Sequence, residues 1–192
     1  MKALRDCITQ HVSVDPASLE DIVSAFEPRD IAKNQFLLRV GSNCREMYFI
    51  ESGYLRMYDL ADGKEVTLWI GSPGKFITSL SSFVFESENY WNIQAITDGR
   101  LFAIGRKAHF ELCQRQPKWL EFDNKLLARS FALLERRMFS HLHMTAKQRL
   151  EVLLEEEPEL FHHVPLQNIA TLLGITPESL SRLRKNLTYG TS

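Results

Sequence analysis

The segment VPLQNIATLLGITPESLSRLRK (residues 164–185) predicts two short helices joined by a tight turn. Apolar residues recur at helical spacing in its first half, so the first helix is expected over about residues 165–173. Gly174 then has the place of a glycine that ends a helix. Thr176 and Pro177 follow as an N-cap and a first helical position. The second helix carries an apolar stripe made of Leu180, Leu183 and Leu187.

This pattern is what a helix-turn-helix requires. Ala170 is small where the helices would cross, and Ile175 fills the corner between them. The polar face of the second helix would then be free to enter a major groove, where Arg182 can bond guanine and Glu178 can accept from cytosine. The remaining polar residues suit phosphate or flexible contacts; they are Thr176, Ser179 and Lys185. The alternative is a helical hairpin whose outer face is only solvated.

Length and charge limit the wider interpretation. A chain of 192 residues can form one large domain and one small one, and its formal net charge of -1 provides no general attraction to nucleic acid. Five basic residues nevertheless precede the helix pair: Arg129, Arg136, Arg137, Lys147 and Arg149. This basic shoulder would either help to hold phosphates or form the solvated face of a helix.

The cysteines and histidines predict no metal centre. Cys7, Cys44 and Cys113 are widely spaced and odd in number, so they form neither a disulfide framework nor a CxxC site. The adjacent pair His162-His163 lacks suitable neighbours and is expected at the surface of a loop. No apolar run approaches the length of a membrane span. We therefore expect a cytoplasmic protein with no membrane association.

From about residue 29 to residue 105 the pattern changes to short strands separated by glycines. Asp62-Gly63 is a strong hairpin signal between two of them. The expected strands are Phe36–Val40, Met47–Glu51, Tyr54–Leu60, Lys64–Ile70, Lys75–Ile77, Asn92–Thr97 and Leu101–Ile104. Together with two amphipathic helices in the first 26 residues, they predict an α+β fold built on a small antiparallel roll or jelly roll.

Such a roll has three common uses. A metal enzyme of the cupin type is disfavoured because the chain has no histidine between His11 and His109. No nucleophile, base and orienting group assemble from the motifs, so we do not expect an enzyme. A ligand sensor would use the hydroxyls and a short helical turn within residues 74–92, namely Thr78, Ser79, Ser81 and Ser82. The third use is a structural dimer scaffold.

After the roll, Pro117 is expected to open a long helix that runs to about His143. Its apolar seam has heptad spacing and suits a parallel two-helix dimer contact, with Asn124 fixing the register. The seam residues are Leu120, Asn124, Leu127, Phe131, Leu134 and Met138. A stripe of this length would also result from packing onto the roll. A further helix over residues 145–157 begins with a capping box at Thr145 and Gln148.

This order of parts resembles the Crp/Fnr family of bacterial transcription regulators. The resemblance covers roughly residues 20–187 and is most specific in residues 166–185 and in VGSNCREMYFIESGYLRMYDLADGKEVTLWIGSPGKFI (residues 40–77), which look like Bacteroidetes-type members. It implies a cyclic-nucleotide-binding-like domain in residues 1–116, a dimerisation helix in 117–143 and a helix-turn-helix DNA-binding domain in 144–192. The DNA-binding domain would be winged-helix-like with a reduced wing, because only a short loop separates Glu157 from Val164.

The chain departs from the family's cyclic-AMP sensors at both charged anchors of the phosphate cassette. The sensors have FIGEL and an Arg-Ser pair, whereas here the matching residues are FITSL (residues 76–80) and Asn89-Tyr90. Charge-assisted hydrogen bonds of this kind contribute about 1.5–3 kcal/mol each. The resemblance adds Leu80, Asn89 and Tyr90 to the candidate ligand pocket. A cyclic nucleotide remains a candidate effector, but we do not expect cyclic AMP in its usual pose.

An iron–sulfur sensor is also not expected, because Cys7 stands alone near the N-terminus. The resemblance therefore implies a homodimeric regulator that binds double-stranded DNA, has RNA polymerase as a further candidate partner and senses an unidentified small molecule. The alternative is a ligand-binding or interaction protein whose helix-turn-helix no longer reads DNA.

Overall fold

The computed structural model describes the backbone of residues 1–189 and the side chains of residues 1–186, so the Leu187 side chain lies outside the described part. The chain begins with α1 (Lys2–Thr9) and α2 (Pro16–Ser24). Eight strands follow: β1 (Glu27–Ile31), β2 (Phe36–Leu38), β3 (Glu46–Ser52), β4 (Leu55–Ala61), β5 (Lys64–Gly71), β6 (Phe76–Ile77), β7 (Asn92–Ala95) and β8 (Gly99–Gly105). A short helix, α3 (Leu80–Phe85), lies between β6 and β7.

The strands form two antiparallel sheets with the orders β1-β8-β3-β6 and β2-β7-β4-β5, which confirms the predicted roll. The predicted hairpin is also confirmed, because Asp62 and Gly63 both have positive φ, at 52° and 74°, as a type I′ turn requires. The sequence does not predict β1. Its residues, EPRDI, are mostly polar and include a proline, which is tolerated because β1 is an edge strand paired only with β8.

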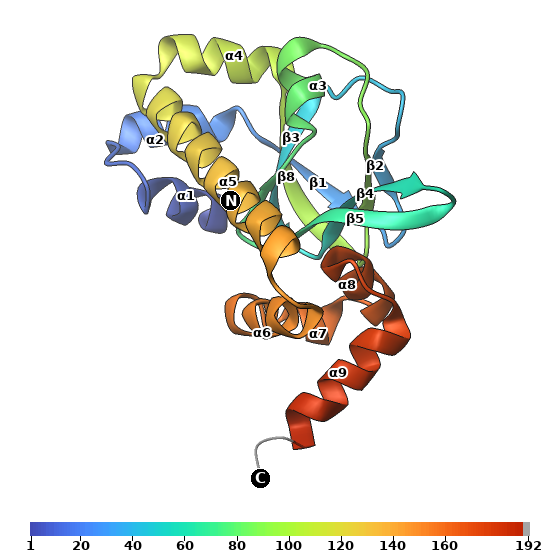
Figure 1. Cartoon of the computed structure of the whole chain (residues 1–192). Helices are drawn as coiled ribbons and strands as arrows, with labels where there is room; N and C mark the ends of the chain where they lie inside the picture. The colour runs from blue at the N-terminus through green and yellow to red at the C-terminus, as the bar shows by residue number, and fades with distance from the viewer. Residues whose placement is uncertain (190–192) are drawn as a thin grey trace.

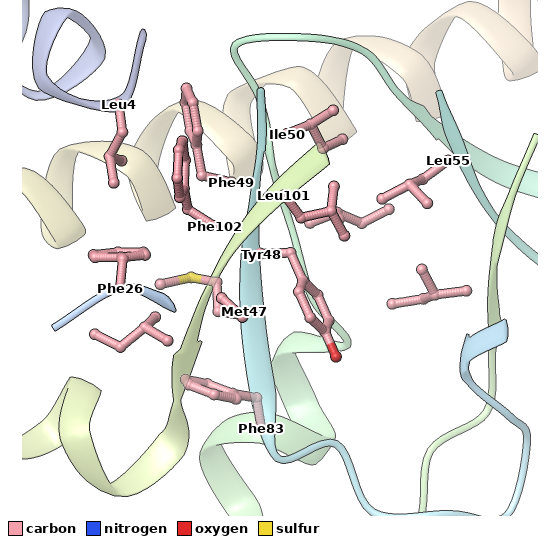
Figure 2. Close-up of a cluster of buried hydrophobic side chains, with 14 of the residues drawn as sticks. Leu4, Phe26, Met47, Tyr48, Phe49, Ile50, Leu55, Phe83, Leu101 and Phe102 are labelled. Carbon is pink, nitrogen blue, oxygen red and sulfur yellow. The ribbon is translucent and has the colours of Figure 1, made fainter. Parts of the chain in front are cut away.

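The main core lies inside the roll and beneath the N-terminal helices. Figure 2 shows Phe49 and Phe102 next to each other, with Leu4 of α1 beside them. Phe49 and Phe102 are register partners on β3 and β8, and both side chains are buried. The first turns of α5 extend this core with Trp119, whose ring lies 5.6 Å from that of Phe26. The start of α5 is therefore fixed to the roll by aromatic packing.

Six helices follow the roll: α4 (Arg106–Arg115), α5 (Pro117–His143), α6 (Ala146–Glu156), α7 (Leu160–His163), α8 (Leu166–Leu173) and α9 (Pro177–Tyr189). The bounds of α5 are those predicted, and the capping box of Thr145 and Gln148 on α6 is present. One expectation is wrong: residues 160–163 form α7 rather than a loop, and His162-His163 lies within it. In Figure 1, α5 crosses the roll and α9 projects away from the rest of the molecule.

A second apolar cluster joins the C-terminal helices to the roll. It combines buried residues of α6, α7, α8 and α9 with Tyr54, Ile70 and Ile96 of the roll. The small helical region is therefore seated on the second sheet rather than tethered by α5 alone. None of the helices within the described residues is long and apolar enough to cross a membrane.

Gly99 allows the start of β8 to approach the end of β3 closely. A Cβ added at Gly99 would lie 2.3 Å from the carbonyl oxygen of Ser52. We expect Gly99→Ala to lower the free energy of unfolding by about 1–3 kcal/mol, the usual cost of overpacking. Gly105→Ala is the matched control, since its Cβ would meet no atom within 4 Å. Equal chemical-denaturation midpoints for the two variants would contradict the assignment.

Candidate DNA-binding and ligand-binding surfaces

The helix pair α8–α9 has the turn that the sequence predicts. Gly174 ends α8 in the left-handed conformation, with φ 67°, and the amide of Ile175 donates to the carbonyl of Ala170 at 3.0 Å. The Thr176 hydroxyl accepts from the amide of Ser179 at 3.3 Å and so caps α9. Ala170 is fully buried where the helices meet. Local signals in the sequence therefore suffice to define this element.

The five residues predicted to contact DNA lie on the first turns of α9 and its cap. Glu178, Arg182 and Lys185 are exposed, Ser179 is half-buried, and Leu180 on the opposite face is fully buried. Arg182 donates to the Ser179 hydroxyl at 3.3 Å, so its guanidinium lies along the outer face. Hydrogen bonds from its own backbone amide and from Thr176 lower the pKa of Glu178. The outer face of α9 therefore carries both an anionic acceptor and two cations.

The basic shoulder does not form a free phosphate-binding patch. Each of its members has a partner within the chain, and the partners are carboxylates, backbone carbonyls or a histidine. For Arg129, Arg136, Arg137, Lys147 and Arg149 they are respectively His11, Glu156, Leu68, Glu151 and Leu173. Two of the five pair with carboxylates, and the other three donate to neutral groups that hold their guanidinium groups within the chain. The phosphate-holding interpretation of this cluster is therefore not supported, because side chains engaged inside the chain are less available to a phosphate.

Arg149 instead stabilises the end of α8. Its guanidinium donates twice to the carbonyl of Leu173, at 3.2 and 3.0 Å, and once to the carbonyl of Met144 at 2.8 Å. Hydrogen bonds with one charged partner contribute about 1.5–3 kcal/mol. We therefore expect Arg149→Met to destabilise α8 by about that amount, measured by amide hydrogen exchange.

The control for this prediction is Lys147→Met, which removes a cation from the same helix. The Lys147–Glu151 pair is exposed and 3.7 Å long, so its loss should change stability by less than about 1 kcal/mol. If Arg149→Met left amide exchange in α8 unchanged, as Lys147→Met is expected to, Arg149 would not cap α8.

The first helix of the pair, α8, is docked on the roll. The hydroxyls of Thr171 on α8 and Thr67 on β5 are 2.7 Å apart, and Arg56 on β4 donates to Asn168 at 3.1 Å. The rings of Tyr54 and His163 stack with centroids 5.1 Å apart. A mainly apolar cavity of about 410 Å³ lies beside this contact, lined by residues of β5, α5, α6 and α8. Sequence reasoning missed this contact, because its residues are more than 100 positions apart.

The candidate ligand cassette is largely committed to internal contacts. The short helical turn predicted there is α3. Thr78 donates to the carbonyl of Glu46 at 3.0 Å, and Ser82 accepts from the amide of Cys44 at 2.8 Å. The Asn89 amide donates to the carbonyls of Arg39 and Trp91. These polar groups therefore hold the loop in shape. Of the other candidates, Ser79 is buried, whereas Leu80, Ser81 and Tyr90 are exposed.

A second cavity, of about 380 Å³, lies next to this loop and is lined by β2, β3 and the segment between them. At its wall Glu46 forms two 2.7 Å bonds with Arg29 and accepts from the Tyr48 hydroxyl at 2.7 Å. The Arg29 bonds lower the pKa of Glu46 despite its partial burial. Sequence reasoning missed Glu46, because its partners are assembled by the sheet and not by a motif.

The heptad seam of α5 is exposed, so it does not pack onto the roll. Trp119 and Phe122 instead face the roll and are buried. The exposed fractions of the apolar seam residues are 43% for Leu120, 36% for Leu127, 62% for Phe131, 48% for Leu134 and 61% for Met138. Asn124 is exposed within the same stripe. An apolar stripe of this extent on a single chain is typical of an interaction surface.

The comparisons with known proteins concern first the roll and then the helices that follow it. Residues 28–116 match the family model of the cyclic nucleotide-binding domain. This part of the chain has the fold of a cyclic nucleotide-binding domain. The anaerobic regulatory protein of Bacillus subtilis is 30% identical to the chain over 96 residues, a match that covers 49% of this chain and only 40% of that relative.

Solved structures extend the likeness beyond that domain to the helices. The regulator CLP of Xanthomonas campestris aligns with a TM-score of 0.71 and 20% identity over 91% of this chain and 92% of that one. FixK2 of Bradyrhizobium japonicum aligns with a TM-score of 0.72 and 18% identity over 86% of both. A protein assigned to the crp/fnr family from Eubacterium rectale gives 0.68 and 20% over 92% and 85%. Over the part of the chain that these alignments cover, 86–92% of its length, the fold is thus that of the Crp/Fnr structures.

Proposed function

We propose that this chain is a DNA-binding transcription regulator of the Crp/Fnr type, working as a homodimer and responding to an unidentified small molecule. The observation that carries the proposal is the outer face of α9. It presents Glu178, Arg182 and Lys185 to solvent while Leu180 is buried against the rest of the helix pair. An exposed polar second helix on a capped turn is what entry into a major groove requires.

The exposed seam of α5 supports the dimer. A second copy packed against it in parallel would bury the aromatic and aliphatic residues centred on Phe131. Such a dimer presents two α9 helices to one side of a duplex, so its site would be a palindrome with half-sites about one helical turn apart. RNA polymerase is a further proposed partner.

The contacts of α8 with β5 support a route by which a structural change in the roll reaches α9. Any ligand that shifts β4 or β5 would act directly on the contacts of Thr67 with Thr171 and of Arg56 with Asn168. We do not expect cyclic AMP in its usual pose to be this ligand, because the cassette lacks both charged anchors and Asn89 is bonded internally. CLP is described as responsive to c-di-GMP, which is a property of that relative.

A second candidate function is an interaction module that does not read DNA. It is favoured by one observation, the engagement of all five shoulder cations with partners inside the chain. The two functions differ in one measurable property. Only a DNA reader binds one duplex sequence more tightly than others at the same salt concentration.

Salt dependence tests the proposed contact surface. Lys185 is exposed on α9 and suits a phosphate contact. A dimer loses two such contacts, so Lys185→Ala should reduce the magnitude of the slope of log K against log salt by about 1.8 on any duplex. Lys33→Ala removes an exposed lysine of the roll and should leave the slope unchanged. Equal slopes for wild type and Lys185→Ala would place the phosphate contacts elsewhere.

A further inference from the structure

Three metal-ligating side chains meet where the roll joins the long helix. His109 and Cys113 are one turn apart on α4, and Asp123 faces them from α5. The His109 Nε2 atom lies 3.6 Å from the nearer carboxylate oxygen of Asp123 and 3.7 Å from the Cys113 Sγ atom. All three candidate ligand atoms lie within 4.8 Å of one another. The sequence predicts no metal here, because the third member comes from the next helix.

The separations suit a shared metal ion. A nitrogen-to-oxygen hydrogen bond spans about 2.7–3.2 Å, so the 3.6 Å between Nε2 and the Asp123 oxygen is too long for a good one. The 3.7 Å between Nε2 and the Cys113 sulfur is compatible with either a hydrogen bond or a shared metal ion. Zinc binds nitrogen and oxygen at about 2.0–2.2 Å and sulfur at about 2.3 Å, and tetrahedral angles then separate the ligands by about 3.3–3.7 Å. The distances from Nε2 to the oxygen and to the sulfur fit that geometry.

The packing around the His109 ring leaves its Nε2 atom as the one that faces Asp123 and Cys113. Phe83, Phe110 and Trp119 surround the ring with edge-on contacts. The Nδ1 atom is buried and has no hydrogen-bond partner among the described residues, so Nε2 is the ring atom that faces polar groups.

The donor set and its exposure define the class of ion. Imidazole, thiolate and carboxylate together suit zinc-like transition metals rather than magnesium or calcium, which prefer oxygen ligands alone. The His109 side chain is 5% exposed and the Asp123 side chain 14%, while Cys113 is half-buried. The ion can therefore enter from the Cys113 and Asp123 side, where water can take the fourth position.

We propose that His109, Cys113 and Asp123 form an exchangeable site for a divalent transition metal such as Zn²⁺, which ties α4 to α5. Metal bound there would fix the angle at which the long helix leaves the roll, because α4 follows β8 directly and α5 carries the exposed seam. The site consists of these three residues, and its proposal does not require that the protein binds DNA.

Cobalt binding to the metal-depleted full chain tests the site. We expect one Co²⁺ per chain, with the visible bands of a tetrahedral ion and a thiolate-to-cobalt charge-transfer band, both removed by added Zn²⁺. Cys113→Ser should abolish the thiolate band. Loss of a residue that only supports a metal ligand weakens metal binding roughly 10- to 100-fold. His109→Asn and Asp123→Asn remove ligands, so they should weaken cobalt binding by at least that factor.

The matched control is Cys7→Ser, which removes the other half-buried cysteine and should keep the spectrum. Circular dichroism checks that each variant is folded, and Asp123→Asn is the least disruptive of the three because it preserves side-chain shape. The proposal is overturned if the wild type shows no thiolate band, if Cys113→Ser retains it, or if folded Asp123→Asn binds cobalt as tightly as the wild type.

Discussion

Replacing Arg182 with alanine is expected to remove most of the preference for a duplex selected from random sequence over an unselected one. Arg182 is exposed on α9 and forms a long 3.3 Å hydrogen bond to the Ser179 hydroxyl, so its guanidinium is available to a base edge. A bidentate arginine–guanine pair contributes about 1–3 kcal/mol of discrimination. A dimer on a palindrome loses two such pairs, so specific affinity should fall roughly 30- to 20,000-fold, with a smaller loss on unselected DNA.

Fluorescence anisotropy with both duplexes at one salt concentration measures this ratio. Arg100→Ala is the control, because it removes an exposed arginine of β8 whose ion-pair distances are long, at 3.7 and 3.9 Å. It should leave both affinities unchanged. If Arg182→Ala bound the selected and unselected duplexes as the wild type does, Arg182 would not be the base-reading residue.

Replacing Phe131 with glutamate on α5 is expected to separate the dimer. Phe131 is 62% exposed in the single chain and lies in the middle of the seam. Burial of such a side chain contributes about 1.5–3 kcal/mol, and each dimer loses two copies, so the dimer dissociation constant should rise roughly 10²- to 10⁴-fold. Specific DNA binding should fall with it, because a monomer contacts one half-site only.

Light scattering coupled to gel filtration gives the mass directly. Ala132→Glu is the matched control, since Ala132 is exposed on the same helix but next to the seam, and it should remain dimeric. A wild-type mass of one chain at micromolar concentration, or an unchanged mass for Phe131→Glu, would show that the seam is not the dimer contact.

Features with local signals could be predicted from the sequence. Pro117 and the period of the apolar residues set the bounds of α5, Asp62-Gly63 sets the hairpin, and Thr176 sets the start of α9. Each of these depends on residues within a few positions of one another, so neighbouring side chains and backbone conformation suffice. β1 is the exception, because a polar edge strand depends on its partner β8 rather than on its own pattern.

Features that depend on distant partners could not be predicted. The Arg137 guanidinium donates to the carbonyl of Leu68, 69 positions away, and Arg149 to that of Leu173, 24 positions away. A run of cations in the sequence therefore looks like a phosphate-binding surface, although the fold engages these side chains with groups inside the chain. The hydroxyls of Thr78 and Ser82 follow the same rule, since their partners come from the segment before and within β3.

Selection of bound sequences from a random duplex library, with the purified full chain at two salt concentrations, tests whether the protein is a dimeric reader of DNA. We expect a palindromic consensus whose half-sites lie about one helical turn apart, roughly 34–36 Å, and which is recovered at both concentrations. Binding that is weak, falls steeply with salt and yields no consensus at either concentration would contradict a dimeric reader of DNA.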